Sequence, residues 1–372
     1  MTRKDTKVIK IGDRVIGGGN PVLIQSMCNT KTEDVHATVE QIQRLEQAGC
    51  DIINTNTFGA NRLKFNSQTE YSLEEIVVPA VRNARAAVEV EGHGYVALDL
   101  GPTGKLLQPL GDLAFEDAVD IYREVIGIGV REGVDLILIE TMSDSLELKA
   151  AVLAAKENSE LPVFATVIFD EKGRLLTGGD AASVVALLEG LKVDALGINC
   201  GLGPVQMKPI LKDILAVSST PVIVNPNAGL PRSENGKTVY DIGVDEFAAE
   251  MADIVDMGAC IVGGCCGTTP EHLETMIGLC REKPLKLPEK KERTVVSSYS
   301  QTVVIGDDPV IIGERINPTG KSKFKQALRD HDLEYILKEA VTQQDNGAHI
   351  LDVNVGLPEI DEPSMMEEVV RE

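Results

Sequence analysis

The chain has 372 residues, of which 43% are hydrophobic, and it contains no tryptophan. Its formal net charge is −22, from 58 acidic and 36 basic residues. This length is sufficient for more than one domain with a buried core. The acidic balance argues against nucleic-acid binding, which requires a basic stripe, and we expect no nucleic-acid partner.

The amino-terminal stretch "MTRKDTKVIKIGDRV" is charged and has no apolar core, so it is not typical of a secretion signal. No uncharged apolar run approaches the ~18–20 residues of a membrane span. Seven cysteines without an export signal suit a reducing compartment, where clustered thiols are more often metal ligands or catalytic groups than disulfides. We therefore expect a cytoplasmic protein that does not bind a membrane.

Short apolar runs alternate with helical patterns along most of the chain. The runs are continuous and β-branched, which is typical of buried parallel strands. The expected strands are 22–27, 51–56, 95–100, 134–140, 162–169, 195–199, 221–225 and 260–264. The expected helices are 34–48, 72–90, 115–132, 145–157, 181–191, 204–216, 243–257 and 270–282. Eight βα units in about 280 residues predict an α/β fold, a closed (β/α)8 TIM barrel, with an open doubly wound sheet as the alternative.

The segment "REKPLKLPEKKERTVVSSYSQ" (281–301) is rich in Lys, Glu, Pro and Ser and is typical of a linker. After it, "PVIIGERINPTG" (309–320), a helix at about 331–346 and "HILDVNVGLPEID" (349–361) form a second βα series of two units. Two units cannot close a barrel, so we expect the chain to be a fragment of a longer protein. The expected domains are a barrel at 1–282, a linker at 283–300 and the truncated beginning of a second (β/α)8 barrel at 301–372.

Three of the cysteines follow expected barrel strands. Cys200 ends the sixth apolar run, and Cys265 and Cys266 end the eighth. Active sites of such barrels lie at the carboxyl ends of the strands, where these two strands are near neighbours, so we expect the three thiols to converge. The other cysteines are less well placed: Cys28 follows the first strand, Cys50 lies at a helix–strand turn, Cys260 opens the eighth strand at the opposite face, and Cys280 lies late in a helix.

Three protein ligands with one open position are the arrangement of a catalytic zinc site, and thiolates are ligands that suit zinc. Glycines flank Cys265 and Cys266 and allow the backbone to turn both side chains inward. The alternative is a set of small buried cysteines that only pack. The trio at these strand ends predicts a metal site.

From about residue 51 to the end, the chain resembles the cobalamin-dependent methionine synthases, which methylate homocysteine. The stretches after the linker, "VVSSYSQTVVIGDDPVIIGERINPTGKSKFKQAL" and "GAHILDVNVGLPEID", resemble the opening of that family's methyltetrahydrofolate-binding barrel. The stretches that carry the resemblance in the first barrel are "NTNTFGANRLK", "LGPTGKLLQPLGDL", "GVDLILIETMSD", "LTGGDA", "DALGINCGLGPVQM", "PNAGLPRSENGKTVYD" and "GGCCGTTPEH".

The resemblance implies that Cys200, Cys265 and Cys266 hold Zn²⁺ and are the catalytic groups. The sulfur of homocysteine would occupy the open position as a thiolate. That thiolate would accept a methyl group from methylcobalamin, which is recharged by 5-methyltetrahydrofolate. The cobalamin would be bound by a domain outside this chain, either in the parent chain or in trans.

The same resemblance suggests residues for the substrate and the pterin. Glu140 would face the amino group of homocysteine; the alternative is an exposed carboxylate at a strand end. Four residues that end the second strand, Asn54, Thr55, Asn56 and Thr57, would line the pocket, with backbone roles in the turn as the alternative. In the second module, the residues that match the pterin site are Glu314, Asn317, Asp352 and Asn354.

The first fifty-two residues differ from that family, whose first strand ends in an "LDGAMGT"-like motif that this chain lacks. They resemble instead the amino terminus of the 4-hydroxy-3-methylbut-2-enyl diphosphate synthases, through "KVIKIGDRVIGGGNPVLIQSMCNTKTEDVHATVEQIQRLEQAGCDI". We interpret residues 1–52 as a foreign first βα unit, joined at the shared "AGCDI". The stretch "GDRVIGGGNP" lacks the spacing of a phosphate-binding loop and predicts a hairpin and a turn into the first strand.

The leading hypothesis is a zinc-dependent homocysteine S-methyltransferase module. The alternative is a non-catalytic zinc-binding barrel, because the loop "SMCNTKTEDV" has no aspartate in the family's place and Asp34 is expected to cap the next helix. This loop predicts zinc-dependent but weak homocysteine binding. A third hypothesis, a hydroxymethylbutenyl diphosphate synthase-like protein, lacks the iron–sulfur domain that such an enzyme needs.

Overall fold

A computed structural model describes residues 9–11, 14–16, 20–27, 35–64, 71–234, 237–306 and 308–372. The chain divides into two compact units, a barrel unit (residues 1–291 and 297–301) and a C-terminal unit (residues 292–296 and 302–372). None of the helices in the described ranges has both the length and the apolar character needed to cross a bilayer.

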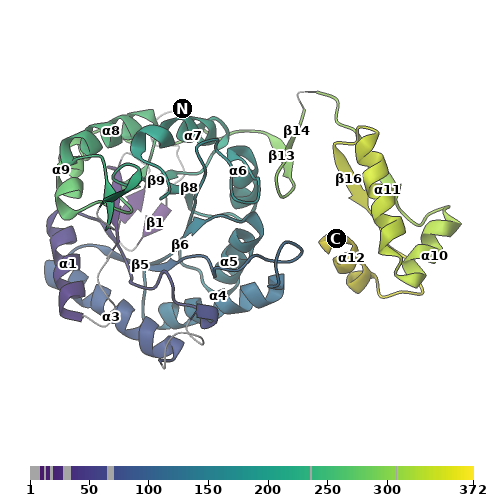
Figure 1. The fold of residues 1–372 in the computed structure, drawn as a ribbon, viewed down its shortest axis with the longest axis horizontal. Helices are drawn as coiled ribbons and strands as arrows, with labels where there is room; N and C mark the ends of the chain where they lie inside the picture. Colours follow the sequence, from purple (N-terminus) through teal and green to yellow (C-terminus); the bar gives the residue numbers. More distant parts are fainter. Residues whose placement is uncertain are drawn as a thin grey trace. The chain divides into compact units, whose positions relative to one another are not determined.

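Eight parallel strands of the barrel unit form a closed ring (Figure 1). The last strand pairs with both the first and the seventh, which closes the ring and excludes the doubly wound alternative. The strands are β3 (Leu23–Ser26), β4 (Ile52–Asn54), β5 (Tyr95–Leu100), β6 (Leu136–Met142), β7 (Val163–Val167), β8 (Ala195–Asn199), β9 (Val222–Asn225) and β12 (Ile261–Gly263). The predicted TIM barrel is therefore confirmed, and the expected strands lie within a few residues of the observed ones.

A helix follows each strand and packs on the outside of the ring (Figure 1). Helix starts follow local chemistry: at Leu73, for example, Ser72 and Glu75 form a reciprocal capping box. The helices are α1 (Val35–Gln47), α3 (Leu73–Glu91), α4 (Phe115–Arg131), α5 (Ser145–Asn158), α6 (Ala181–Gly190), α7 (Pro204–Val217), α8 (Val244–Met257) and α9 (Pro270–Cys280).

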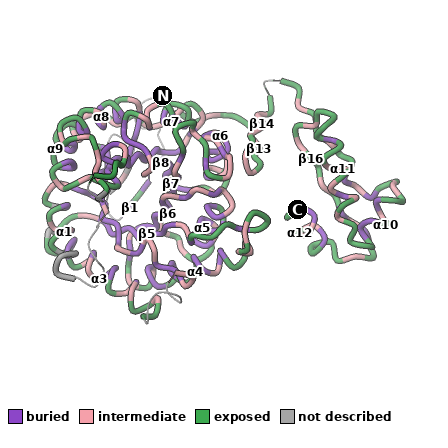
Figure 2. Tube along the Cα trace, viewed as in Figure 1, coloured by how far each residue is buried: buried purple, intermediate pink, exposed green. Residues whose placement is uncertain are grey.

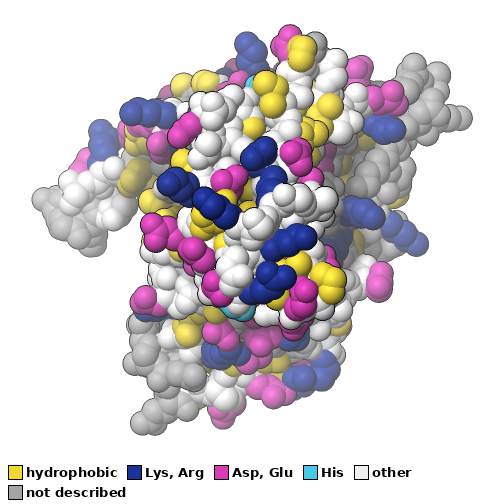
Figure 3. All heavy atoms as spheres, turned by 90° about the vertical axis from the view of Figure 1, so that its right-hand side faces the viewer, with side chains coloured by type: hydrophobic (Ala, Val, Ile, Leu, Met, Phe, Trp, Pro, Cys, Tyr) yellow, Lys and Arg dark blue, Asp and Glu magenta, His cyan; other side chains and the backbone are white. Residues whose placement is uncertain are grey.

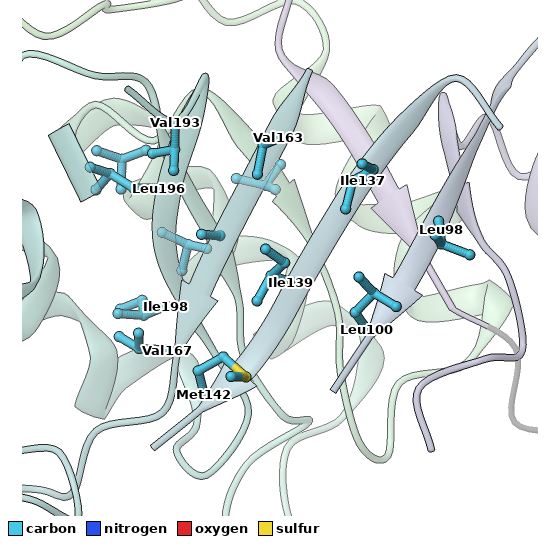
Figure 4. Close-up of a cluster of buried hydrophobic side chains, with 14 of the residues drawn as sticks. Leu98, Leu100, Ile137, Ile139, Met142, Val163, Val167, Val193, Leu196 and Ile198 are labelled. Atoms are coloured by element: carbon cyan, nitrogen blue, oxygen red, sulfur yellow. The ribbon is translucent and has the colours of Figure 1, made fainter. Parts of the chain in front are cut away.

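The alternation of side chains along the strands produces two separate apolar layers. The outer cluster lies between strands and helices, and Figure 4 shows its members on β5 to β8, such as Leu98, Ile137 and Ile198. The inner cluster fills the ring with the intervening residues, including Ala97, Leu138 and Phe164. Figure 2 shows that burial follows the strands and the helix sides that face them. Each fully buried aliphatic side chain stabilises the fold by about 1.5–3 kcal/mol.

An antiparallel hairpin, β1 (Ile9–Ile11) with β2 (Arg14–Ile16), precedes the barrel, as the sequence predicts. Ile9 and Ile11 are buried in the inner cluster together with Leu23 and Cys260, residues at the amino-terminal ends of the strands. The hairpin therefore closes this end of the barrel, and the chemistry is left to the opposite end.

Three aspartates at the amino-terminal end connect neighbouring strands in the same way. Each lies just before one strand, accepts a hydrogen bond of 2.7–3.1 Å from a backbone N–H of the preceding strand, and pairs with a basic residue at or after a helix. The three sets are Asp51 with Ile24 and Arg281, Asp135 with Val96 and Arg85, and Asp194 with Val163 and Lys156. This repeated contact accounts for the aspartate in "AGCDI".

Two further hairpins occur along the chain, one between the barrel strands β9 and β12 and one after helix α9. The first, β10 (Pro231–Glu234) with β11 (Lys237–Tyr240), follows β9. The second, β13 (Thr294–Ser297) with β14 (Thr302–Ile305), begins within the predicted linker (283–300) and ends in the domain predicted for 301–372, where neither strand was expected. The β-branched runs "TVVS" and "TVVI" account for this difference, because such residues favour strands.

The C-terminal unit contains two parallel strands, β15 (Ile312–Ile316) and β16 (Ile350–Val353), which pair with each other. Its helices are α10 (Ser322–Asp330), α11 (Leu333–Asp345) and α12 (Glu362–Arg371), and they enclose a small core around Phe324 and Ile336. Its surface carries ion pairs such as Arg329–Glu359, and basic and acidic side chains are interspersed on the face shown in Figure 3. That this unit begins a second barrel stays a prediction.

Candidate metal centre and substrate site

Three cysteines converge at the carboxyl end of the barrel, as the sequence predicts. Cys200 directly follows β8, and Cys265 and Cys266 follow β12. The Sγ atom of Cys266 lies 3.9 Å from that of Cys200 and 4.0 Å from that of Cys265, and all three sulfur atoms lie within 4.8 Å of one another. Four ligands at about 2.3 Å from a tetrahedral metal ion lie about 3.8 Å apart. The trio therefore fits three corners of a tetrahedral thiolate site.

The backbone around the cysteines is held in unusual conformations. Cys200 has a φ of 55°, in the left-handed region that residues other than glycine rarely adopt. Gly263 lets the strand before the other two cysteines approach β3 closely, because a Cβ there would lie 2.1 Å from the carbonyl oxygen of Gln25. Such local strain is typical of functional sites that the surrounding structure holds in place.

The loop after β9 holds both cysteine loops in position. The carbonyl oxygen of Asn225 accepts from the N–H of Cys200 at 3.0 Å, and that of Pro226 accepts from Cys265 at 2.8 Å. The side chain of Asn227 accepts from the N–H of Cys266 at 3.2 Å. The family resemblance includes this loop, but the sequence alone indicates no role for its residues.

The pKa values of the three thiols are shifted in different directions. Hydrogen bonds with Cys200 and Cys265 lower the pKa of Cys266 to about 2, and Tyr240 adds to this effect. Hydrogen bonds with Cys200 and Cys266, together with burial, raise the pKa of Cys265 well above its usual value. The hydrogen bond with Cys265 lowers the pKa of Cys200, but Cys266 and burial outweigh it and raise this pKa to about 11. Without a bound ion, Cys266 is therefore the thiol of the trio that loses its proton most readily.

A layer of polar side chains lies directly above the inner apolar cluster. It is formed by inward-facing residues near the carboxyl ends of the strands, all of them buried: Gln25, Asn54, Asp99, Glu140, Thr166, Asn199 and Asn225. Several of their oxygen atoms are buried and have no hydrogen-bond partner among the described residues. Buried polar atoms are normally paired, so unpaired ones at the mouth of a barrel indicate a place for a ligand.

Glu140 is 2% exposed, so the alternative of an exposed carboxylate at a strand end is wrong. Burial, together with the charge on Cys266, raises its pKa to about 8. Asp99, on the neighbouring strand β5, was not identified from the sequence. Burial raises its pKa well above the usual value, and the neighbouring Glu140 raises it further, against a hydrogen bond from Asn54. Glu140 thus lies close to Cys265 and Cys266, and Asp99 lies close to Glu140.

The residues expected at the end of β4 have different roles. Asn54 belongs to the polar layer. The hydroxyls of Thr55 and Thr57 lie 2.6 Å apart and bind the backbone of β5, since Thr55 accepts from the N–H of Asp99 and Thr57 donates to its carbonyl. Both hydroxyls thus make backbone contacts of the kind that the alternative expected, and a role of either residue in lining the pocket stays a prediction. Asn56 is half-buried.

Asn199 connects the end of β8 to its neighbours, directly before Cys200. Its side-chain oxygen accepts from the N–H of Thr141 and from the hydroxyl of Thr166, both at 2.9 Å. Its amide nitrogen donates to the hydroxyl of Thr141 at 2.7 Å. Its polar atoms are therefore used within the protein, in contrast to those of Asp99 and Glu140.

Cys50, Cys260 and Cys280, the other cysteines that the structure describes, lie away from the trio. Cys50 and Cys280 are buried in the outer cluster and Cys260 in the inner one, which agrees with the opposite face expected for Cys260. Cys28, Asp34 and most of the loop "SMCNTKTEDV" lie outside the described residues. The weak homocysteine binding expected from this loop therefore stays a prediction.

Of the residues expected at the pterin site, Glu314 and Asp352 lie within the two paired strands of the C-terminal unit, and Asn317 and Asn354 directly follow them. Glu314, Asp352 and Asn354 are exposed, and Asn317 is half-buried. The side chain of Asn317 accepts from the N–H of Thr319, and that of Asn354 accepts from Gly356. Both asparagines thus stabilise their own loops, and the four side chains form no buried site.

Comparisons with known proteins agree with the fold and identify the family. A profile of the family "Homocysteine S-methyltransferase" matches residues 19–278. Methionine synthase of Mycobacterium leprae is 32% identical over 365 residues, and that of Mycobacterium tuberculosis is 33% identical over 361 residues. Each alignment covers 92% of this chain, but the chain spans only 29% of the length of either relative.

Solved structures of a homocysteine methyltransferase, MmuM from Escherichia coli, have the same barrel. Its oxidized form gives a TM-score of 0.59 at 21% identity and covers 69% of this chain and 95% of its own. Its metallated form gives 0.58 at 21% identity, with 70% and 96% covered. This likeness supports the fold.

The comparisons give no support to a diphosphate synthase origin for residues 1–52. The family profile begins at residue 19 and so includes β3 and α1, and β3 pairs with both β4 and β12 as an integral strand. Because the profile covers more than half of the chain and both relatives exceed 30% identity over most of it, the chain belongs to the homocysteine S-methyltransferase family.

Proposed function

We propose that the barrel unit is the homocysteine-binding module of a cobalamin-dependent methionine synthase. Residues 1–282 would form this module, residues 283–300 would connect it, and residues 301–372 would begin a pterin-binding barrel. The observation that carries the proposal is the trio of sulfur atoms, whose spacing of 3.9 and 4.0 Å suits one tetrahedral ion.

In this proposal, Cys200, Cys265 and Cys266 bind Zn²⁺ through their thiolates and leave one position open. Bound zinc would supply a Lewis acid that lowers the pKa of a thiol in that position. The backbone contacts of the loop after β9 hold the cysteines in place for this. The polar layer, with Glu140 next to the thiols, would orient the polar end of homocysteine.

The methyl donor in this proposal is methylcobalamin, carried by a domain in the parent chain or in trans. 5-Methyltetrahydrofolate would recharge it at a site that includes Glu314, Asn317, Asp352 and Asn354. These assignments rest on the resemblance to methionine synthases.

Metal analysis and calorimetry on the purified chain test the proposal. We expect about one zinc per chain, and homocysteine binding to the zinc-loaded protein but not to the metal-free protein. Cys265→Ala should remove both. Cys280→Ala is the matched control, because Cys280 is buried in the outer cluster away from the site, and it should retain both. Zinc retained by Cys265→Ala would refute the metal site, and zinc without homocysteine binding would indicate a non-catalytic zinc-binding barrel.

A further inference from the structure

The hairpin of β13 and β14 has a turn that belongs to the barrel unit. Residues 297–301, here called the hairpin tip, are part of that unit, whereas the rest of the hairpin is part of the C-terminal unit. The tip is closed by its own hydrogen bonds. The carbonyl of Gln301 accepts from the N–H of Ser298 at 2.9 Å, and the side chain of Ser298 accepts from the N–H of Gln301 at 3.2 Å. The tip is therefore a defined turn that can support what it contacts.

The tip contacts two loops at the carboxyl end of the barrel. Ser145, which begins α5 after β6, donates from its hydroxyl to the carbonyl oxygen of Tyr299 at 3.4 Å. In the loop after β7, a Cβ at Gly179 would lie 3.4 Å from the same oxygen, and one at Gly178 would lie 3.8 Å from the Cβ of Ser300. Because neither glycine has a side chain, the tip lies directly against this loop.

The phenol of Tyr299 lies near both loops. Its hydroxyl oxygen is buried, as is that of Thr177 in the loop after β7, and neither has normal hydrogen-bond geometry to a partner among the described residues. Burial raises the pKa of Tyr299; Thr177 opposes this shift, and the charge on Asp144, after β6, adds to it. The contribution of this side chain is therefore expected from the packing of its ring and not from its hydroxyl.

The first of the two loops is fixed to the residue before Cys200. The N–H of Thr141, near the end of β6, donates to the side-chain oxygen of Asn199 at 2.9 Å, and the amide nitrogen of Asn199 donates to the hydroxyl of Thr141 at 2.7 Å. Thr141 has a φ of 61°, so this double contact holds a strained backbone. Asp144 caps the start of α5, which is where the tip binds. The connection from β6 to α5 is thus held at both ends.

The second loop packs on Gly201, the residue after the first cysteine of the trio. A Cβ at Gly201 would lie 2.9 Å from the side chain of Ile168, which directly follows β7. The N–H of Ile168 donates to the carbonyl of Met142 at 3.1 Å, so the two loops are also joined to each other. Further along, the carbonyl of Gly179 accepts from the N–H of Leu175 at 2.8 Å, and the side chain of Leu175 is buried in the outer cluster. The loop is thus anchored between Gly201 and the tip.

We propose that Tyr299 is a positioning residue for Cys200, because the hairpin tip supports the loops after β6 and β7, and these loops fix the backbone on either side of this cysteine. Cys200 has a φ of 55°, so its conformation depends on the structure around it. This inference rests on the proposed function, because it treats Cys200 as a zinc ligand. Coupling through packed loops and hydrogen bonds typically changes an affinity by about 2–30-fold.

Zinc affinity and backbone hydrogen exchange of the full chain test the inference. Tyr299→Ala removes the ring. We expect about 2–30-fold weaker zinc binding in competition with a chromophoric chelator, and faster exchange of the metal-free protein in residues 168–180 and 199–202. Tyr299→Phe keeps the ring and should match wild type in both measurements. Val296→Ala is the matched control, because Val296 is an exposed residue of the same hairpin outside the tip, and it should also match wild type.

The possible outcomes separate this inference from the proposed function. Wild type that binds no zinc refutes the proposed function, and exchange at residues 199–202 in Tyr299→Ala then decides whether the tip positions Cys200. If Tyr299→Ala exchanges faster only in residues 168–180 and keeps its zinc affinity, the tip orders that loop without positioning Cys200, and the inference is wrong. It is also wrong if Tyr299→Ala changes neither measurement, or if Tyr299→Phe and Val296→Ala lose as much zinc affinity as Tyr299→Ala.

Discussion

The side-chain oxygen of Asn227 accepts a hydrogen bond from the backbone N–H of Cys266 at 3.2 Å, while the N–H of Asn227 donates to the carbonyl of Leu202 at 3.0 Å. One residue of the loop after β9 therefore connects the loop of Cys266 to that of Cys200. Groups that hydrogen-bond to metal ligands orient them and so affect metal affinity. The loop after β9 orients the cysteines of the thiol trio in this way.

Asn227→Ala should weaken zinc binding about 10–100-fold, the usual effect of removing a group that orients metal ligands. Competition with a chromophoric chelator measures the affinity. Asn158→Ala is the control, because Asn158 binds only the backbone of its own helix in the described structure, through Ala154. Equal zinc affinity in Asn227→Ala and wild type would show that the backbone contacts alone position Cys266.

A substitution at Gly267 tests whether Tyr240 also supports Cys266. Its φ is +84°, and a Cβ there would lie 2.3 Å from the ring of Tyr240, whose hydroxyl helps to lower the pKa of Cys266. Gly267→Ala should therefore displace Tyr240 or the cysteine loop, and we expect at least about tenfold weaker zinc binding.

Gly133→Ala separates steric conflict from backbone strain. Gly133 has nearly the same φ, +86°, but a Cβ there would meet nothing within 4 Å. This variant should lose about 1–2 kcal/mol of unfolding free energy from left-handed strain and keep its zinc affinity. If both variants lose zinc equally, contact with Tyr240 is not the reason.

The aspartates at the amino-terminal end of the barrel should contribute to stability mainly as hydrogen-bond acceptors, and two variants of Asp135 test this. Asp135 accepts from the buried N–H of Val96 at 2.7 Å and from Arg85 at 2.8 Å. Asp135→Ala leaves that N–H unpaired and should cost about 1–3 kcal/mol in urea denaturation. Asp135→Asn keeps an acceptor and should lose about 1 kcal/mol or less, because the ion pair is partly exposed. If both variants lose the same unfolding free energy, the ion pair with Arg85, and not the hydrogen bond to Val96, provides the stability.

Most of the barrel was predictable because buried parallel strands are continuous apolar runs. The segments 95–100 and 195–199 were predicted with the observed bounds, and closure followed from eight units of similar length. The docking of the first hairpin was not predictable. Ile9 and Ile11 become buried only after the barrel has closed, when they pack against the inner cluster at its amino-terminal end. No local sequence pattern encodes that contact.

The thiol site was predictable because strand ends of a barrel converge whatever their separation in sequence. Asp99 was missed because it lies within the apolar run "YVALDL". Alternation within that run was the available signal, since Tyr95, Ala97 and Asp99 share one face. Asn227 gave no such signal, because its role depends on loops that come together only in the folded chain.

Glu147 on α5 gives a pH-dependent prediction away from the metal centre. Its buried carboxylate accepts from the N–H of Thr103 at 2.6 Å and from the hydroxyl of Tyr122 at 3.1 Å, which holds the loop after β5. Burial raises its pKa above 4.5, although these hydrogen bonds oppose the shift. The folded protein therefore binds this proton more tightly than the unfolded chain does.

A raised folded-state pKa contributes stability that is fully present below the unfolded-state pKa and is lost as the pH rises through the folded-state value. Glu147→Gln carries no charge at any pH, so the unfolding free energy of wild type minus that of this variant should fall as the pH rises from about 4 through the raised folded-state pKa of Glu147. Urea denaturation at several pH values measures this difference. Glu157→Gln, an exposed change on the same helix, should follow wild type at every pH. A constant difference for Glu147→Gln would mean that the hydrogen bonds to Thr103 and Tyr122 fully offset the cost of burying the charge.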